Sequence, residues 1–471
     1  MDRPADGLLD PLVTDRTPQG DAHGPLDLAV HGDLVLPGGE IVRDGWLGVR
    51  DGRIASIGAE PLPAHDTVDA RGRWVLPGAI DAHVHARSNP DEGLPATTTG
   101  AAAGGTTTVI DMPFDAPDAP VRDAATLRAK IDDVAREAVV DVALWATFAP
   151  DGGLDAIAPL AEAGACGFKA STIGVDPVRF PRIPDHQLLW ACQEIAATGR
   201  PFAAHQENQE IVEATTARLR AQASRDGIQH ARSRHQIAET EAAARLLEIA
   251  RAAGARLHMV HGTVARTFEL IHQHRTSGTQ ASGETCLHYL AMDENDLSRM
   301  GARAKCNPPL RARSEVDALW AGLADGAIDI VTSDHSPYPE ARKSGDLFDA
   351  AAGMPGVETL LTMLHSEGVA TGRIDVSRFT ELLCERPADL FGLTRKGRLA
   401  IGRDADFVIF DGSVTRTLEA SELAHPIGWS PFEGREVAGR VEATWLRGQR
   451  VFDRAAGFVG APGSGAFVRP D

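Results

Sequence analysis

Short apolar runs that alternate with helical stretches between residues 77 and 395 are the feature that most constrains the fold of this chain. We count eight such runs, which end near His85, Asp111, Phe148, Lys169, His205, His261, Glu284 and Asp334. Amphipathic helical patterns lie between several of them, for example over residues 185–197 and 236–253. Eight strands alternating with helices are typical of a (β/α)8 barrel, so we predict an α/β protein with a TIM barrel over residues 77–395.

The segments on either side of this region read as short strands. Residues 27–76 and 396–455 alternate apolar and polar side chains between glycine-containing turns, without a helical period. Each segment is short for an independent sheet, so we expect the two to pair into one small β-sandwich domain beside the barrel. We expect residues 1–26 to be a disordered tail and residues 456–471 to be a C-terminal tail.

Composition narrows the possible partners and the compartment. The chain carries 47 basic and 66 acidic side chains, a formal net charge of -19, which disfavours nucleic acid or an anionic membrane as a partner. The five cysteines form no CxxC pair, and the first 26 residues contain no apolar run typical of a signal peptide. We therefore expect a cytoplasmic protein that acts on a small molecule.

Polar side chains recur where the predicted strands end. Because the carboxyl ends of barrel strands meet at one rim, we expect these side chains to lie together at the mouth of the barrel. Imidazole and carboxylate groups are ligands for zinc and other divalent metals, and an HxH pair on a strand points both imidazoles to one face. The predicted metal ligands are His83, His85, Lys169, His205, His261 and Asp334.

Lys169 is the unusual member of this set. The chain contains only 5 lysines among its 47 basic residues, so arginine is its ordinary surface cation. A lysine amine with a lowered pKa is nucleophilic, and addition of CO₂ would give a carbamate whose two oxygens can bridge two cations. The alternative is that Lys169 forms a salt bridge at the rim.

Asp334 is the candidate catalytic residue. Besides binding a metal, its carboxylate could take a proton from a water whose pKa a metal lowers toward about 7. A serine nucleophile is disfavoured because the chain has no GxSxG motif, and phosphate-binding glycine motifs are also missing. We expect His258 to be structural, and His288 and His335 to support the site from nearby.

Several segments, taken in order, resemble the cyclic amidohydrolases of the amidohydrolase superfamily over residues 27–455. They are "PGAIDAHVH", "AGGTTTVIDMP", "GFKAS", "HQEN", "LHMVHGT", "GETCLHYL", "KCNPPLR", "SDHSP" and "GRDADFVIFD". The resemblance implies two divalent metal ions, usually zinc, bridged by a lysine that CO₂ has N6-carboxylated. It assigns His83, His85, Lys169 and Asp334 to one ion, and Lys169, His205 and His261 to the other. It also implies hydrolysis of a cyclic amide, with Asp334 moving the proton.

Within this superfamily the chain is most similar to allantoinases, notably in "GFKASTIGVDPVRFP" and "LWAGLADGAIDIVTSDHSP". That similarity implies conversion of allantoin to allantoate in purine catabolism. Dihydroorotases remain an alternative because Arg87 matches their carboxylate-binding arginine, although Phe114 and Tyr338 replace their usual Asn and His. Hydantoinases, or dihydropyrimidinases, are a second alternative, although the tyrosine they carry after the bridging lysine is missing from "ASTIGVDPVRF".

Two residues are candidate substrate contacts. Arg87 could pair with a carboxylate or ureido oxygen, or it could be a structural arginine of the rim. Asn307 replaces a smaller residue that is typical at its position. By analogy with relatives we expect a homo-oligomer, either a dimer or a tetramer. A metal-free oligomeric scaffold is the non-enzyme alternative, but such chains have usually lost several ligands that are present here.

Overall fold

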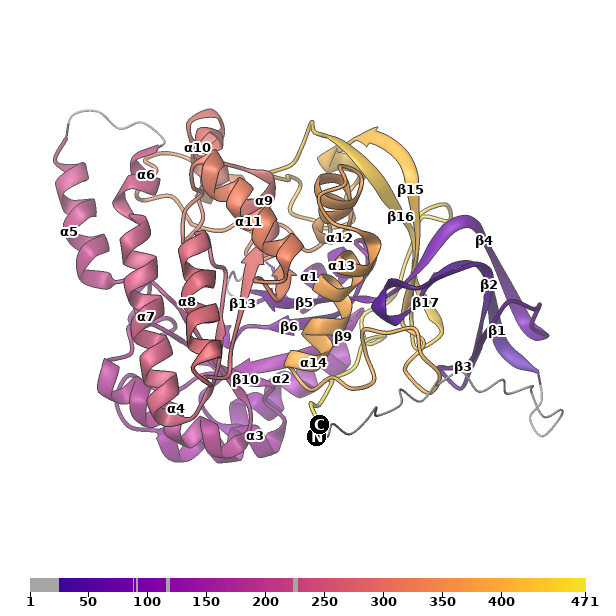
Figure 1. The fold of residues 1–471 in the computed structure, drawn as a ribbon, viewed down its shortest axis with the longest axis horizontal. Helices are drawn as coiled ribbons and strands as arrows, with labels where there is room; N and C mark the ends of the chain where they lie inside the picture. The colour runs from indigo at the N-terminus through magenta and orange to yellow at the C-terminus, as the bar shows by residue number, and fades with distance from the viewer. Residues whose placement is uncertain (1–24, 88, 90–91, 116–118, 223–227) are drawn as a thin grey trace, which may run out of the picture.

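A computed structural model describes residues 25–87, 89, 92–115, 119–222 and 228–471 (Figure 1). Eight parallel strands form a nearly closed barrel and confirm the predicted fold class, each corresponding to one of the predicted runs. In sheet order they are β14 (Ile330–Thr332), β13 (Ala281–Cys286), β12 (Arg256–Met259), β11 (Pro201–His205), β10 (Gly167–Ser171), β9 (Asp141–Ala146), β6 (Thr106–Asp111) and β5 (Ala79–Val84). The seam between β14 and β5 is joined by a bridge between Val84 and His335 and by the Asp81 carboxylate, which accepts the Ser333 N–H at 3.1 Å.

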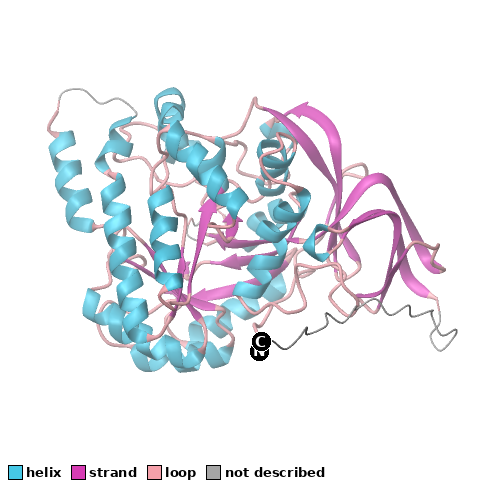
Figure 2. Ribbon diagram, in the orientation of Figure 1, coloured by secondary structure: helices cyan, strands magenta, loops and turns pink. Residues whose placement is uncertain are grey.

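Helices surround the barrel strands (Figure 2). Helices α4 and α7, predicted over residues 185–197 and 236–253, lie next to each other on the outside. The helices are α1 (Leu94–Ala103), α2 (Ala124–Glu137), α3 (Ile157–Ala163), α4 (Asp185–Thr198), α5 (Gln209–Arg220), α6 (Ile228–Ser233), α7 (Gln236–Ala253), α8 (Ala265–Thr276), α9 (Leu287–Ala291), α10 (Glu294–Met300), α11 (Arg313–Asp325), α12 (Leu360–Leu364), α13 (Val376–Thr380) and α14 (Arg386–Leu390). None of the helices in the described ranges is long and apolar enough to span a membrane.

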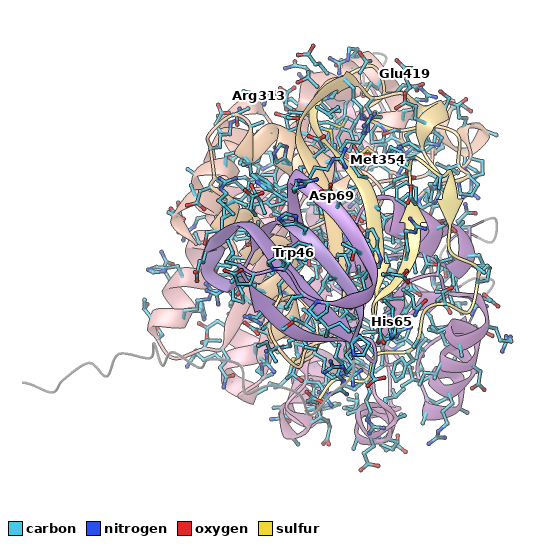
Figure 3. All side chains as sticks on the ribbon, turned by 90° about the vertical axis from the view of Figure 1, so that its right-hand side faces the viewer. Trp46, His65, Asp69, Arg313, Met354 and Glu419 are labelled. Carbon is cyan, nitrogen blue, oxygen red and sulfur yellow. The ribbon has the colours of Figure 1, made fainter. Side chains whose placement is uncertain are left out.

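The two flanking segments pair with each other beside the barrel, as expected, and their strands form one continuous mixed sheet. Its parallel β1–β4 and antiparallel β4–β15 pairings join the N-terminal strands to the C-terminal ones. In Figure 3, where Trp46 on β2 and Asp69 on β4 are labelled, this sheet lies in front of the barrel. The order is β18 (Phe458–Val459), β17 (Gln449–Asp453), β16 (Glu436–Leu446), β15 (Phe407–Thr417), β4 (Ala64–Pro77), β1 (Leu26–Val35), β2 (Ile41–Arg50) and β3 (Arg53–Gly58). A separate pair, β7 (Phe114–Asp115) and β8 (Ala119–Pro120), follows β6.

The inside of the barrel is apolar below its mouth. Ile80, Ala82, Trp145 and Ile330 belong to one buried cluster drawn from strands around the ring. The pairing of β5 with β6 is irregular between Asp81 and Val84. An irregularity of this kind re-aims side chains, and here His83 turns toward the interior directly after Ala82.

The C-terminal segment is bound to the barrel. The N–H of Val142, at the start of β9, donates to the Ala466 carbonyl at 2.9 Å, and the Val468 N–H donates back to Val142. The Arg200 guanidinium donates to the carbonyls of Pro470 and Asp471 at 3.3 and 2.8 Å. Residues 456–471 are therefore part of the folded structure, although their composition suggested a tail. Of the N-terminal tail expected over residues 1–26, residues 1–24 lie outside the described residues.

Candidate metal centre

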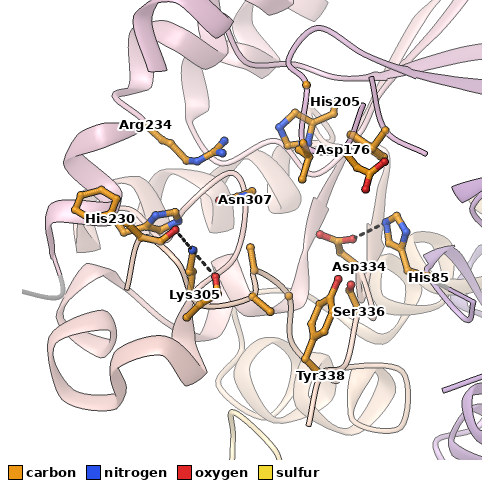
Figure 4. A pocket seen from close by; sticks show the side chains of 18 of the residues that line it. His85, Asp176, His205, His230, Arg234, Lys305, Asn307, Asp334, Ser336 and Tyr338 are labelled. Carbon is orange, nitrogen blue, oxygen red and sulfur yellow. Dashed lines mark hydrogen bonds and ion pairs between the residues drawn. The ribbon is translucent and has the colours of Figure 1, made fainter. Parts of the chain in front are cut away.

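A cavity of about 600 Å³ opens at the carboxyl ends of the barrel strands (Figure 4). Its wall includes five of the six predicted ligands, namely His85, Lys169, His205, His261 and Asp334. The sixth, His83, is fully buried next to Asp334. Side chains from five strands, far apart in the sequence, are therefore brought to one place.

His83, His85 and Asp334 form one tight group. Asp334 Oδ1 lies 3.2 Å from His83 Nε2 and 3.5 Å from His85 Nε2. Ligand atoms of all three residues lie within 4.8 Å of one another, a separation that one metal ion can span. Figure 4 shows the Asp334 carboxylate and the His85 ring facing each other across the cavity wall.

His205 and His261 stand beside this group. Their ring centroids are 4.7 Å apart, and the His261 ring centroid is 5.4 Å from that of His83. His205 Nε2 lies 2.7 Å from Glu207 Oε2, which leaves Nδ1 as the ring nitrogen that could bind an ion. His261 and Asp334 have φ values of 38° and 44°, in the left-handed region that side chains other than glycine rarely adopt. Such backbone strain is concentrated at functional sites.

Two ring nitrogens in the centre have no hydrogen-bond partner within the described ranges. They are His83 Nε2 and His261 Nδ1, and both are buried. His83 Nε2 is close to Asp334 but lacks the geometry of a hydrogen bond. Because a buried polar atom without a partner is costly, two unsatisfied imidazole nitrogens, one of them next to the Asp334 carboxylate, fit a site that binds a metal ion.

Lys169 differs from the other lysines of the chain. All five lysines are buried. Lys130 and Lys396 pair with aspartates, whereas Lys305 and Lys343 donate to backbone carbonyls. In contrast, no hydrogen bond or ion pair to Lys169 Nζ is found in the part of the chain that the structure describes. Lys169 is 1% exposed, so the alternative of a salt-bridged rim lysine is not what the structure contains.

The surroundings of Lys169 lower the pKa of its amine. Its Nζ lies 5.7 and 6.0 Å from the ring centroids of Phe180 and Phe114. Burial lowers the pKa of Lys169 to about 8, although the charge of Asp334 acts in the opposite direction. The amine is therefore neutral far more often at neutral pH than an exposed lysine is.

The imidazoles and the carboxylate are held in the forms that bind metals. Burial lowers the pKa values of His85, His205 and His261, which keeps these rings neutral. Burial also acts to raise the pKa of Asp334, but the neighbouring His83 and His85 hold it below the usual range of aspartic acid.

Sequence reasoning missed the carboxylates that contact these histidines. Glu284 on β13 contacts His83, and Glu207 contacts His205 while also pairing with Arg234. The available signal was the acidic residue near the end of the seventh predicted strand, where no ligand had been assigned. His230 on α6, which the sequence analysis did not single out, also lines the cavity.

The two candidate substrate contacts lie in different places. Asn307 lines the cavity, and its buried Oδ1 has no hydrogen-bond partner within the described ranges. Arg87 is not among the residues that line the cavity, because its guanidinium pairs with Asp133 on α2 and lies 3.7 Å from Asp115. The structure thus supports a structural role for Arg87.

Two neighbouring clusters of possible ligands are less suited to a metal ion. Glu92 bonds to His335 Nε2 at 3.1 Å and His425 Nε2 at 2.8 Å, and Nδ1 of each ring accepts a backbone N–H. All four ring nitrogens therefore have partners. Cys286 and His288 lie near Asp334, but burial raises the pKa of the Cys286 thiol well above its usual value, which disfavours the thiolate.

The sequence and the structure were each compared with known proteins, and the two comparisons agree. The model of the amidohydrolase family matches residues 74–451. Allantoinases of Solibacter usitatus and Rubrobacter xylanophilus are 38% and 39% identical to the chain, over 93% of it and over 97% and 98% of their own lengths. The solved L-hydantoinase (dihydropyrimidinase) from Arthrobacter aurescens is similar with a TM-score of 0.90 and 33% identity, covering 94% of this chain and all of that one. The dihydropyrimidinase from Brevibacillus agri has a TM-score of 0.85 and 28% identity, with coverages of 94% and 98%.

Proposed function

The chain belongs to the amidohydrolase family, and on that premise we propose that it is a metal-dependent hydrolase that opens the ring of allantoin to give allantoate. One observation carries the proposal. Six side chains from five strand ends meet at one cavity, five of them in its wall and His83 buried next to Asp334, and the buried lysine among them has no ion-pair partner in the described residues. The curated relatives are named allantoinases, which supports allantoin as the substrate among the possible cyclic amides.

Two divalent metal ions, which we propose to be zinc, would be held in this cavity. His83, His85 and Asp334 would hold one and His205 and His261 the other, with Lys169 contributing to both. Bound there, the metals would supply Lewis-acid activation of a water and of the substrate carbonyl. The unsatisfied ring nitrogens of His83 and His261 support this assignment.

Lys169 would act as an N6-carboxylated lysine. Its neutral amine attacks the carbon of CO₂, a C–N bond forms as one C=O π bond breaks, and the nitrogen releases a proton to solvent. The product is a carbamate anion with two oxygens. A pKa of about 8 supports this step, because the neutral fraction of the amine at pH 7 is then roughly 300 times that of an ordinary lysine.

Asp334 would move the proton during ring opening. Its carboxylate accepts a proton from the attacking water and then delivers it to the ring nitrogen that leaves. The position of Asp334 at the cavity wall, in contact with His83 and His85, supports this role.

Polar side chains in the cavity wall would orient the ureide. Asn307 lines the cavity, and its side-chain amide would form a hydrogen bond with a ring or ureido group of the substrate. Tyr338 also lines the cavity, and Figure 4 shows its hydroxyl on the side that holds Asp334. The Tyr338 backbone is fixed because the Trp429 indole donates to its carbonyl at 3.0 Å.

The test is a turnover screen of the purified, metal-loaded enzyme with allantoin, dihydroorotate, dihydrouracil and hydantoins. We expect ring opening of allantoin with the highest kcat/KM. Turnover of dihydroorotate, or of hydantoins and dihydrouracil, without turnover of allantoin would replace the proposed substrate with that of a related enzyme. No turnover, together with less than about half an equivalent of metal per chain, would favour the scaffold alternative. We also propose a homo-oligomer, which light scattering would test.

A further inference from the structure

Glu284 occupies a central position below the cavity. It lies on β13, a strand that supplies none of the six candidate ligands, and its side chain is 1% exposed. Its Oε1 lies 2.5 Å from His83 Nδ1 and accepts the backbone N–H of His261 at 3.2 Å. Its Oε2 lies 3.1 Å from Nε2 of His258. One carboxylate therefore connects two candidate ligands that come from different strands.

The contact with Glu284 determines which nitrogen of His83 carries a proton. Glu284 Oε1 accepts the backbone N–H of His261, so this oxygen acts as a hydrogen-bond acceptor. His83 Nδ1 lies 2.5 Å from the same oxygen and must therefore be an N–H. His83 then carries its proton on Nδ1, which leaves a lone pair on Nε2 next to Asp334.

The contact with His261 acts on the backbone. His261 has a φ of 38°, which is unfavourable for a residue with a side chain. Glu284 offers its N–H a charged acceptor, and such bonds are stronger than those between neutral groups. This conformation brings the His261 ring to 5.4 Å from the His83 ring.

We propose that Glu284 is a positioning residue that fixes the tautomer of His83 and the backbone of His261, and thereby sets the metal affinity of the centre. The inference rests on the proposed function, because it takes both histidines as metal ligands. Glu284 does not line the cavity, so it acts through these histidines without touching the substrate.

A pair of substitutions separates positioning from the general effect of losing a buried carboxylate. Glu284→Gln keeps the size of the side chain but replaces the charge and one acceptor. Glu358→Gln is the matched control, because Glu358 is also buried and accepts the backbone N–H groups of Ala424 and His425, away from the six candidate ligands. Both variants and the wild type are loaded with Zn²⁺ and bicarbonate as full-length proteins. Their metal dissociation constants are then measured by competition with a chromophoric chelator, next to their urea unfolding midpoints.

We expect Glu284→Gln to raise the metal Kd by about 10- to 100-fold, and Glu358→Gln to change it by less than about twofold. If the wild type binds metal and Glu284→Gln binds it with the same Kd, this inference is overturned and the proposed function stands. A wild type that binds under about half an equivalent would instead overturn the proposed function. Should Glu284→Gln fail to fold, Glu284→Asp replaces it, since the shorter carboxylate withdraws from His83. An unchanged Kd in that variant would equally overturn the inference.

Discussion

Two buried lysines at opposite ends of the barrel show how surroundings determine what an amine can do. At the base, Lys396 Nζ lies 2.6 Å from Asp141, 2.7 Å from Asp406 and 2.9 Å from Asp404. Their charges raise the pKa of Lys396 although burial acts to lower it. At the mouth, Lys169 faces phenyl rings and imidazoles, no carboxylate pairs with it in the described residues, and its pKa falls to about 8.

The comparison separates a structural cation from a reactive amine. Asp141 begins β9, while Asp404 and Asp406 precede β15 of the flanking sheet, so Lys396 joins the barrel to that sheet. The three aspartates form a group that could hold a metal, but the ammonium of Lys396 already compensates their charge. Both lysines are buried, but only Lys396 is paired with carboxylates. This pairing, more than burial, distinguishes the structural cation from the reactive amine.

Lys169→Ala should have the largest effect. We expect kcat/KM on allantoin to fall below about one thousandth of the wild-type value, because the carbamate and its contribution to both metals are lost. Short carboxylic acids added with metal should partly restore turnover by filling the space. Full activity of this variant would exclude the carbamate, and an unchanged unfolding midpoint serves as the control for folding.

Lys396→Met should have the opposite effect to Lys169→Ala, because it should lower stability and leave activity unchanged. Removing the ammonium leaves three buried carboxylates without compensation, so we expect the free energy of unfolding to fall by about 3–5 kcal/mol. Urea denaturation followed by circular dichroism measures this loss. Metal content and kcat per folded chain should stay at wild-type values. Loss of metal with no loss of stability would contradict the distinction between a structural Lys396 and a reactive Lys169.

The pH dependence of CO₂ addition should report the lowered pKa of Lys169. Only the neutral amine reacts, so its reactive fraction rises about tenfold per pH unit below a pKa of about 8 and levels off above it. The measurement is the rate at which apo-enzyme regains activity after addition of metal, at a fixed concentration of dissolved CO₂. A rate that still rises steeply above pH 9 would place the pKa at the value of an ordinary lysine.

Asn307→Ala should affect binding more than chemistry. We expect KM for allantoin to rise about tenfold with kcat within about threefold, since the substitution removes a polar side chain of the cavity wall but no metal ligand. Steady-state kinetics measure both constants. Unchanged kinetics would remove Asn307 from the substrate site.

Arg87→Ala should have the smallest effect on turnover. Because the Arg87 guanidinium pairs with Asp133 and lies near Asp115, we expect KM to change by less than about twofold. The same kinetic assay checks it. A tenfold rise in KM with full metal content would return Arg87 to the substrate site.

Much of the fold was predictable because barrel strands have a local signature. All the apolar runs except the one near Phe148 end in a polar residue at the rim, so the predicted strands indicated which side chains would meet. The seventh predicted strand pointed to Glu284, but only three-dimensional packing shows that it contacts His83. The contact of Glu207 with His205 has no such signal in the sequence. The Arg87 side chain likewise points toward Asp133 on α2, with which it forms an ion pair. The strand pattern gave no indication of this helical partner. The C-terminal segment bonds to β9 mainly through its backbone, which composition does not encode.

Labelling with ¹³CO₂ tests the reactive amine at the mouth most directly. Wild-type enzyme loaded with zinc in ¹³C-bicarbonate should show one carbamate ¹³C resonance that survives gel filtration, with about two metal ions per chain. The resonance should be missing from Lys169→Ala and present in Lys396→Met. A wild-type protein with full metal content and no carbamate resonance would contradict the account.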